Sequence, residues 1–153
     1  MNRGHKVSFS GGETILIVDD NDGDRKLMFL ALTEHGYRVL EAHDANEALQ
    51  IFRSQAGKID LVLTDIVMPG MNGVELAECI RKMSPKTKIF FISGYKRKFA
   101  GEIGVESVDF IKKSDLPHLL RKVREVLSRS YLPIPPTKVL RKDLPRGNIS
   151  AAE

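Results

Sequence analysis

The chain has almost no cysteine and no long apolar stretch, and these two features exclude several classes of protein. Its 153 residues include a single cysteine, Cys79, so no disulfide can form within the chain, which fits a reducing compartment. The longest apolar runs have the length of single strands and are too short to span a bilayer. Residues 1–12 lack the apolar core of a secretory signal. We therefore expect a cytoplasmic protein that is not inserted in a membrane.

Positive charge is in excess, but no nucleic-acid-binding motif accompanies it. The formal net charge is +4, and much of the excess lies near the two ends of the chain, at Arg3, Lys6, Lys138, Arg141, Lys142 and Arg146. Two further basic clusters lie inside, at 96–98 and 112–113. No helix-turn-helix, zinc-finger or RNA-binding motif occurs with them. We interpret the excess as a solvated basic surface and expect no nucleic-acid partner.

Two hydrophobic periods alternate from Thr14 to about Ser130 and predict five strands and five helices. The predicted strands lie at 15–18, 37–42, 59–64, 88–93 and 107–111, and the first and fourth contain wholly apolar runs at 15–18 and 89–92. Segments with helical spacing lie at 25–35, 45–52, 72–83, 95–103 and 116–127. The segment at 95–103 is the weakest, because glycines shorten it. Asp44 and Ser114 are the predicted N-caps of the second and the last helix.

Strands and helices that alternate in this way predict a doubly wound, five-stranded parallel sheet with helices on both faces. Right-handed crossovers leave few topologies, and the flavodoxin-like strand order 2-1-3-4-5 is the common one that we predict here. We expect this domain to cover residues 13–130. Residues 1–12 are predicted to be a flexible segment, and residues 131–153 a proline-rich, basic tail or linker.

Three carboxylates follow strands that this topology places side by side. Asp19 and Asp20 end the first strand, and Asp65 ends the third. Ligands of such sheets bind at the carboxyl ends of the strands, where the strand order reverses, which here lies between the first and third strands. Three carboxylates close together raise one another's pKa, and Mg²⁺ would relieve the repulsion. Alternatively, Asp19 and Asp20 only cap or solvate a strand end.

The segment after Asp65 adds weight to a cation site. It runs Ile66-Val67-Met68-Pro69-Gly70-Met71-Asn72-Gly73, a rigid loop punctuated by glycine that leads into a helix start at Asn72. Such a loop could hold the backbone carbonyl of Val67 beside a cation.

These motifs resemble the receiver domain of bacterial response regulators over residues 13–130. The shared features are the Asp19-Asp20 pair, the stretch Leu63-Thr64-Asp65-Ile66-Val67-Met68-Pro69-Gly70-Met71-Asn72-Gly73, Ser93 at the end of the fourth strand and a lysine after the fifth. Each motif is weak evidence by itself. Four of them in the right order on the right elements make the resemblance specific.

The resemblance implies a role for each of these residues. Asp65 would be the nucleophile that takes a phosphoryl group from a phosphohistidine of a partner kinase. The Mg²⁺ ligands would be Asp19 (mainly through water), Asp20, Asp65 and the carbonyl oxygen of Val67. Ser93 would donate its hydroxyl to a phosphoryl oxygen, and Lys113 would place an ammonium beside the phosphoryl group.

Three positions around the fifth strand need a separate argument. Phe110-Ile111-Lys112-Lys113 matches the family's aromatic-aliphatic-any-Lys pattern, which selects Lys113 and leaves Lys112 as a solvated strand end. Phe110 occupies the aromatic switch position, where it would act with Ser93 by packing alone; it could equally be a core aromatic. Ser114 stands where the family usually has proline, which argues against a cis peptide bond there.

The leading hypothesis is a signalling module, not an enzyme, that receives phosphate from a histidine kinase or a phosphotransfer protein. It would then change its affinity for a downstream protein at the face formed by the fourth helix, fifth strand and fifth helix. The alternative is a receiver-fold interaction module that works without phosphate. An aspartyl-phosphate hydrolase would need a second carboxylate soon after the nucleophile, where this chain has Val67. The sequence leaves open which kinase and which downstream protein take part, and whether the domain forms a homodimer.

Overall fold

The apolar runs form one parallel sheet in the computed structural model, which describes residues 12–94 and 110–128. The strand order is β2-β1-β3-β4-β5, so the predicted flavodoxin-like fold is confirmed. The strands are β1 (Thr14–Val18), β2 (Arg38–Ala42), β3 (Leu61–Asp65), β4 (Lys88–Ser93) and β5 (Phe110–Lys112). The helices are α1 (Asp22–Glu34), α2 (Ala45–Ser54), α3 (Gly73–Met83) and α5 (Leu116–Ser128). The helix predicted at 95–103, most of the N-terminal segment and the whole tail lie outside the described residues.

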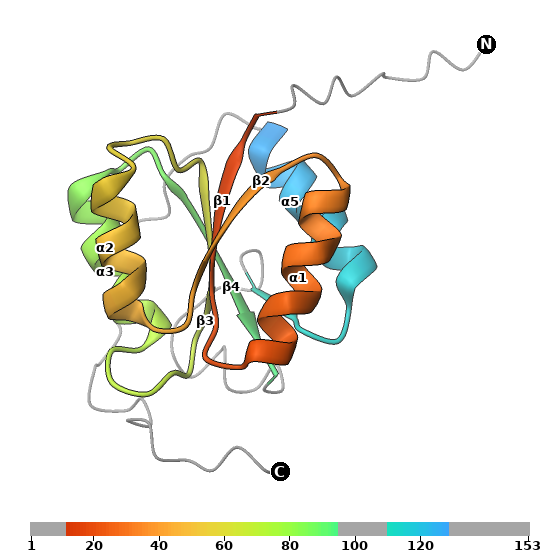
Figure 1. Ribbon diagram of the computed structural model, residues 1–153, viewed down its shortest axis with the longest axis horizontal. Coiled ribbons are helices and arrows are strands. Elements are labelled where there is room, and N and C mark those ends of the chain that lie inside the picture. Colours follow the sequence, from red (N-terminus) through yellow and green to blue (C-terminus); the bar gives the residue numbers. More distant parts are fainter. Residues whose placement is uncertain (1–11, 95–109, 129–153) are drawn as a thin grey trace.

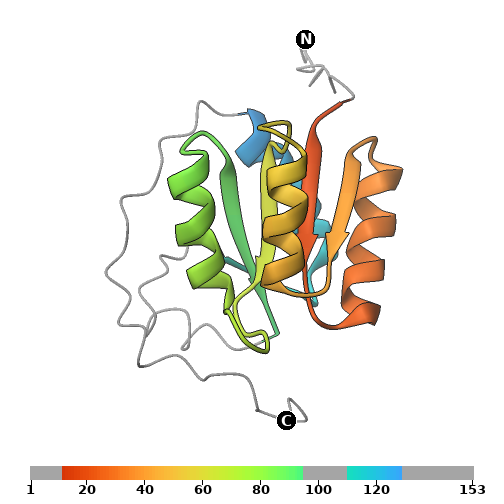
Figure 2. The same ribbon diagram turned by 60° about the vertical axis from the view of Figure 1, so that its left-hand side comes forward.

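Helices cover the sheet on both faces, with α2 and α3 on one side and α1 and α5 on the other (Figure 1). Figure 2 shows α2 (yellow) and α3 (green) in front of the sheet. Alternate residues of β1 pack into the two cores: Leu16 and Val18 on the α2 and α3 side, Ile15 and Ile17 on the other. Because both faces are buried, each central strand is apolar along its length instead of alternating with polar residues.

Side-chain caps begin α2 and α3, and the one at Asp44 was predicted. The side chain of Asp44 accepts a hydrogen bond from the Glu47 N–H at 2.7 Å, which confirms this N-cap of α2. The Glu47 carboxylate reaches back to the N–H of His43, one residue earlier than a capping box requires. Helix α3 has the complete box, since Asn72 and Glu75 each accept from the other's main-chain N–H. These caps satisfy donors that a helix start leaves unpaired.

The start of α1 and the cap of α5 differ from the prediction. Helix α1 begins at Asp22, three residues before the predicted start at 25, because Asn21 caps it and its first turn is polar. Because this turn has no apolar residues with helical spacing, the hydrophobic pattern alone does not identify it as helix. The start of α5 is capped by Asp115, whose carboxylate accepts from the His118 N–H at 3.2 Å, so the predicted cap at Ser114 is wrong. The peptide bond before Ser114 is trans, like all the others in the described residues.

The parallel sheet gathers chemically active residues at one end. Val18 of β1 lies opposite Thr64 of β3, so Asp19 follows one strand beside Asp65 at the end of the other. Ser93 ends β4, where it lies opposite Lys112 of β5. Within the described part of the chain, no helix has the length and apolarity needed to cross a membrane.

Candidate functional site

Asp19 is buried at the carboxyl end of the sheet. Its main-chain N–H donates to the carbonyl of Ala42 at 3.1 Å, which extends the pairing of β1 and β2 by one residue. Oδ1 of its fully buried side chain accepts from the N–H of Asn21 at 2.9 Å. Oδ2 forms an ion pair with the ammonium of Lys113 at 2.8 Å. Burial raises the pKa of Asp19 above its ordinary value, against the opposing effect of Lys113.

Asp20 and Asp65 complete a cluster of carboxylates. One carboxylate oxygen from each of Asp19, Asp20 and Asp65 lies within 4.8 Å of the other two. Asp20 is exposed, whereas Asp65 is only 6% exposed. Burial, helped by the neighbouring charges of Asp19 and Asp20 and opposed by Lys113, raises the pKa of Asp65 to about 6. The topology thus brings Asp65 beside the Asp19-Asp20 pair, from which it is far removed in the sequence.

Lys113 lies at the centre of this cluster. Its Nζ is 2.8 Å from Asp19 Oδ2, 3.0 Å from Asp65 Oδ2 and 3.1 Å from Asp24 Oδ2. The side chain is 14% exposed, and its pKa is raised because the attraction of Asp65 and Asp19 outweighs burial. Lys112 is exposed. Of the two lysines that the sequence offered, Lys113 is the one that contacts Asp65.

Two residues of α1 belong to the site although the sequence analysis did not select them. Asp24 contacts Lys113, and Arg25 donates from Nη1 to the main-chain carbonyl of Asp19 at 2.7 Å. Arg25 also pairs with Asp22 at 2.6 Å and with Glu41 at 3.4 Å, so it ties the β1–α1 loop to the end of β2. The sequence did contain a signal for them, the run of polar residues directly after Asp19. Because the first helix was predicted to begin only at residue 25, most of this run was interpreted as a loop.

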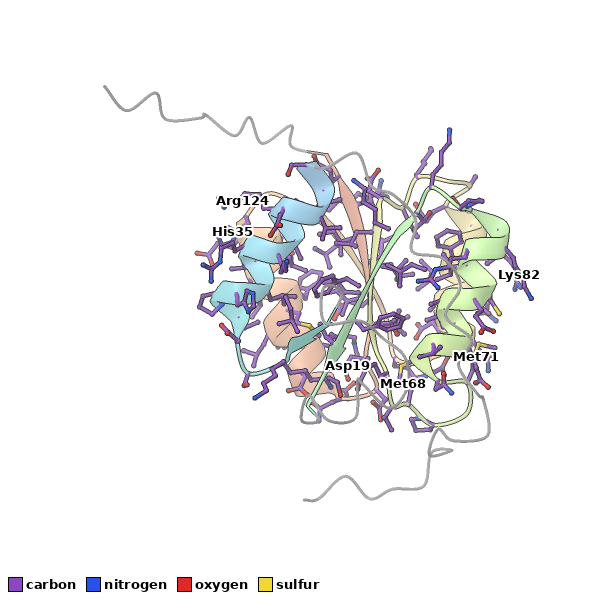
Figure 3. All side chains as sticks on the ribbon, turned by 180° about the vertical axis from the view of Figure 1, so that it is seen from behind. Asp19, His35, Met68, Met71, Lys82 and Arg124 are labelled. Atoms are coloured by element: carbon purple, nitrogen blue, oxygen red, sulfur yellow. The ribbon has the colours of Figure 1, made fainter. Side chains whose placement is uncertain are left out.

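The loop after β3 holds the backbone of Asp65 in place. The Thr64 hydroxyl donates to the Asp65 carbonyl at 2.9 Å, and the Gly73 N–H donates to the Ile66 carbonyl at 2.8 Å. A Cβ atom at Gly73 would lie 2.0 Å from the Asp65 carbonyl oxygen, so only glycine allows this approach. Met68 is buried in the core and lies at the same end of the sheet as Asp19 (Figure 3).

The remaining predicted site residues occupy the expected elements. Ser93 is fully buried at the end of β4, and its carbonyl accepts from the Lys113 N–H at 3.2 Å. Val67 follows β3 and packs its side chain against the core on the α2 and α3 side. The side chain of Phe110 lies outside the described part of the chain. The metal contact of the Val67 carbonyl and the switch role of Phe110 stay predictions.

The donor set fits a small divalent cation. It offers hard carboxylate oxygens, which Mg²⁺ prefers over nitrogen or sulfur. The negative charge of three carboxylates, with ligand oxygens within 4.8 Å of one another, is larger than the positive charge that Lys113 contributes. Asp19 Oδ2 is buried and lies 2.8 Å from the ammonium of Lys113. The negative charge that Lys113 leaves unbalanced would be neutralised by a divalent cation.

A model of the response regulator receiver domain matches residues 15–124, and the chain belongs to this family. Receiver domains are signalling domains of two-component systems and not classical enzymes. The resemblance drawn from the Asp-Asp pair and the Asp65 loop is confirmed.

Known relatives place the chain among receiver domains that form parts of larger proteins. It is 37% identical over 126 residues to the sensor kinase CckA of Brucella abortus, which covers 80% of this chain and 13% of that kinase. It is 34% identical over 119 residues to the autoinducer 1 sensor kinase/phosphatase LuxN of Vibrio harveyi, a match that covers 74% of this chain and 13% of that protein. The chain thus spans about an eighth of the length of these curated relatives.

Solved structures agree with this assignment. The receiver domain from the hybrid histidine kinase CckA is 37% identical and aligns with a TM-score of 0.64, covering 75% of this chain and 99% of that one. The response regulator TrrA from Thermotoga maritima is 34% identical with a TM-score of 0.66, covering 74% and 98%. That protein was crystallised in complex with Mg²⁺ and BeF.

The raised pKa of Asp65 predicts a pH-dependent stability of the cation-free protein. Asp65 binds its proton more tightly when folded, with a pKa of about 6 against 3.8 for the free side chain. Between these values the folded state holds more protons than the unfolded state, so the free energy of unfolding falls as the pH rises. Replacing Asp65 by asparagine removes this term. Relative to wild type, Asp65→Asn should gain on the order of 2 kcal/mol between about pH 4 and pH 7.

Urea unfolding in the presence of a chelator, at a series of pH values, measures this difference. Asp60→Asn is a useful comparison, because this aspartate lies at the opposite end of the sheet, where it accepts from the Thr14 N–H at 2.8 Å. A difference between wild type and Asp65→Asn that stays constant over this pH range would contradict the assignment of a raised pKa to Asp65.

Proposed function

We propose that this domain accepts a phosphoryl group on Asp65 from a histidine kinase or a histidine phosphotransfer protein and thereby changes its affinity for a downstream protein. The observation that carries the proposal is the position of Asp65, which is 3.0 Å from Lys113 and within 4.8 Å of Asp19 and Asp20. An acid and an ammonium held in this way provide a nucleophile and a countercharge for phosphoryl transfer.

The transfer itself is a displacement at phosphorus. A carboxylate oxygen of Asp65 forms the new P–O bond while the P–N bond to the donor histidine breaks, and the imidazole leaves with the bonding electrons and takes up a proton. The main task of the protein is to position the groups and to stabilise their charge. Thr64 and Gly73 hold the Asp65 backbone, which limits the positions from which its carboxylate can attack.

A cation and Lys113 would share the neutralisation of charge. Asp19, Asp20, Asp65 and the carbonyl oxygen of Val67 would hold Mg²⁺, which when bound supplies positive charge to the phosphoryl oxygens. Lys113 would place its ammonium on another phosphoryl oxygen, and Ser93 would donate its hydroxyl. A response regulator 34% identical to this chain was crystallised with Mg²⁺ and BeF, which supports a Mg²⁺ site at the acidic cluster.

The output would be a change of surface. Once Ser93 turns toward the phosphoryl group, Phe110 would repack behind it and alter the face that includes β5 and α5. The downstream protein would bind that face. Phosphorylation of Asp65 would be the same step whether the domain passes phosphate along a relay or regulates a downstream target.

The proposal is tested by intact mass spectrometry after incubation with acetyl phosphate and Mg²⁺. We expect one added phosphoryl group that requires Mg²⁺ and is absent from Asp65→Ala. An adduct that persists in Asp65→Ala would place the acceptor elsewhere. No adduct on folded wild-type protein, with a second receiver domain labelled in parallel, would favour an interaction module that works without phosphate.

A further inference from the structure

Asp24 of α1 contacts Lys113, the residue that also pairs with Asp19 and Asp65. Its Oδ2 accepts a hydrogen bond from Lys113 Nζ at 3.1 Å, across 89 positions of sequence. Asp24 is not among the three acids that lie close enough together to hold a cation. Its side chain is 40% exposed, whereas that of Asp19 is fully buried. Lys113 is therefore shared by two acids of the cation cluster and one acid outside it.

A simpler role for Asp24 is that of an acid in the first turn of a helix. An acid there interacts favourably with the helix dipole, and at this position it often reaches back to the N–H of the N-cap residue. In this chain the N–H of Asn21 is taken by Asp19 Oδ1 at 2.9 Å. The main-chain N–H of Asp24 donates to Asn21 Oδ1, while its carboxylate turns to Lys113. Its side-chain contact is with the site and not with its own helix.

We infer that Asp24 is a positioning residue that competes with the phosphoryl group and with the cation's ligands for the ammonium of Lys113. The inference rests on the proposed function of Asp65. A cation bound to Asp19 and Asp65 weakens their hold on Lys113, and Asp24 then becomes its strongest partner. A phosphoryl group on Asp65 must draw Lys113 away from Asp24 before the two can pair.

This competition gives Asp24→Asn two effects of opposite sign. Without the Asp24 charge, Lys113 pairs only with Asp19 and Asp65 and holds them against the cation, so Mg²⁺ should bind roughly threefold more weakly. Once Mg²⁺ is saturating, Lys113 has no competing partner for a phosphoryl group. Beryllofluoride, an analogue of that group, should then bind roughly threefold more tightly. Asparagine keeps the shape of the side chain, so packing changes little.

Isothermal titration calorimetry measures both affinities, first for Mg²⁺ alone and then for beryllofluoride at saturating Mg²⁺. Glu34→Gln is the matched control, because it removes the same charge from the exposed, opposite end of α1. The control should leave both affinities near wild type. Equal shifts in Asp24→Asn and Glu34→Gln would overturn the inference in favour of a general charge effect. A loss of both affinities in Asp24→Asn would overturn it in favour of structural damage.

A double-mutant cycle with Lys113→Met decides whether the effect passes through the lysine. In that background Asp24→Asn should change the Mg²⁺ affinity by less than about 1.5-fold, since the shared partner is gone. An undiminished change would overturn the inference. If wild type takes up phosphate from acetyl phosphate while Asp24→Asn binds both ligands as wild type does, this inference alone fails. If wild type takes up none, the proposed function fails and this inference with it.

Discussion

Replacing Lys113 by methionine is expected to slow the phosphorylation of Asp65 by about 10²-fold or more and to tighten the binding of Mg²⁺. The first effect follows because the transferring group loses the only ammonium that lies beside Asp65 among the described residues. The second follows because the ammonium no longer neutralises Asp19 and Asp65, which lie 2.8 and 3.0 Å from it. Acetyl phosphate labelling followed over time measures the first effect, and calorimetric titration with Mg²⁺ the second.

Lys112→Met is the matched control for this experiment. It removes the same charge one residue earlier, from a side chain that is exposed. We expect labelling within about twofold of wild type, because exposed charges at this distance are largely screened. If Lys112→Met slowed labelling as much as Lys113→Met, the choice of Lys113 would be wrong. If Lys113→Met left the rate unchanged, the ammonium would have no part in the transfer.

Gly73→Ala is expected to destabilise the domain by about 3 kcal/mol and to slow phosphorylation by about tenfold or more. The new Cβ would lie 2.0 Å from the carbonyl oxygen of Asp65 and 2.9 Å from its carbonyl carbon, both backbone atoms that cannot rotate away. Either the start of α3 or the end of β3 has to move. Because β3 is fully buried and paired on both sides, movement costs free energy and displaces the Asp65 carboxylate.

Gly70→Ala separates this clash from ordinary backbone strain. Gly70 lies in the same loop with φ of 76°, but a Cβ there would meet nothing within 4 Å. It should cost about 1 to 2 kcal/mol through its left-handed backbone alone and leave the labelling rate near wild type. Urea unfolding and acetyl phosphate labelling of both variants provide the comparison. Equal effects of the two substitutions on labelling would show that loop strain, and not the contact with Asp65, limits the reaction.

The pattern of hydrophobic residues was sufficient to predict the fold because each element follows a strong local rule. The central strands are buried on both faces, so they appear as apolar runs such as 15–18 and 89–92. Helices α2 and α3 carry caps at Asp44 and Asn72 that a sequence pattern can identify. The start of α1 was misplaced because its first turn is polar and has no apolar periodicity. Asp115 was missed as a cap because the neighbouring Ser114 is an equally good N-cap residue.

The sequence by itself determined the strand order, the family and the three acids at one end of the sheet. It could do so because those acids end strands whose adjacency follows from chirality and from short crossover connections. Only the tertiary structure gave the contacts of Lys113 with Asp19 and Asp65, and only it showed that Asp24 and Arg25 belong to the site. It also showed that Gly73 lies too close to the Asp65 carbonyl to allow a Cβ atom. These facts depend on side-chain directions and on how closely separate elements approach, and neither follows from the local spacing of residues.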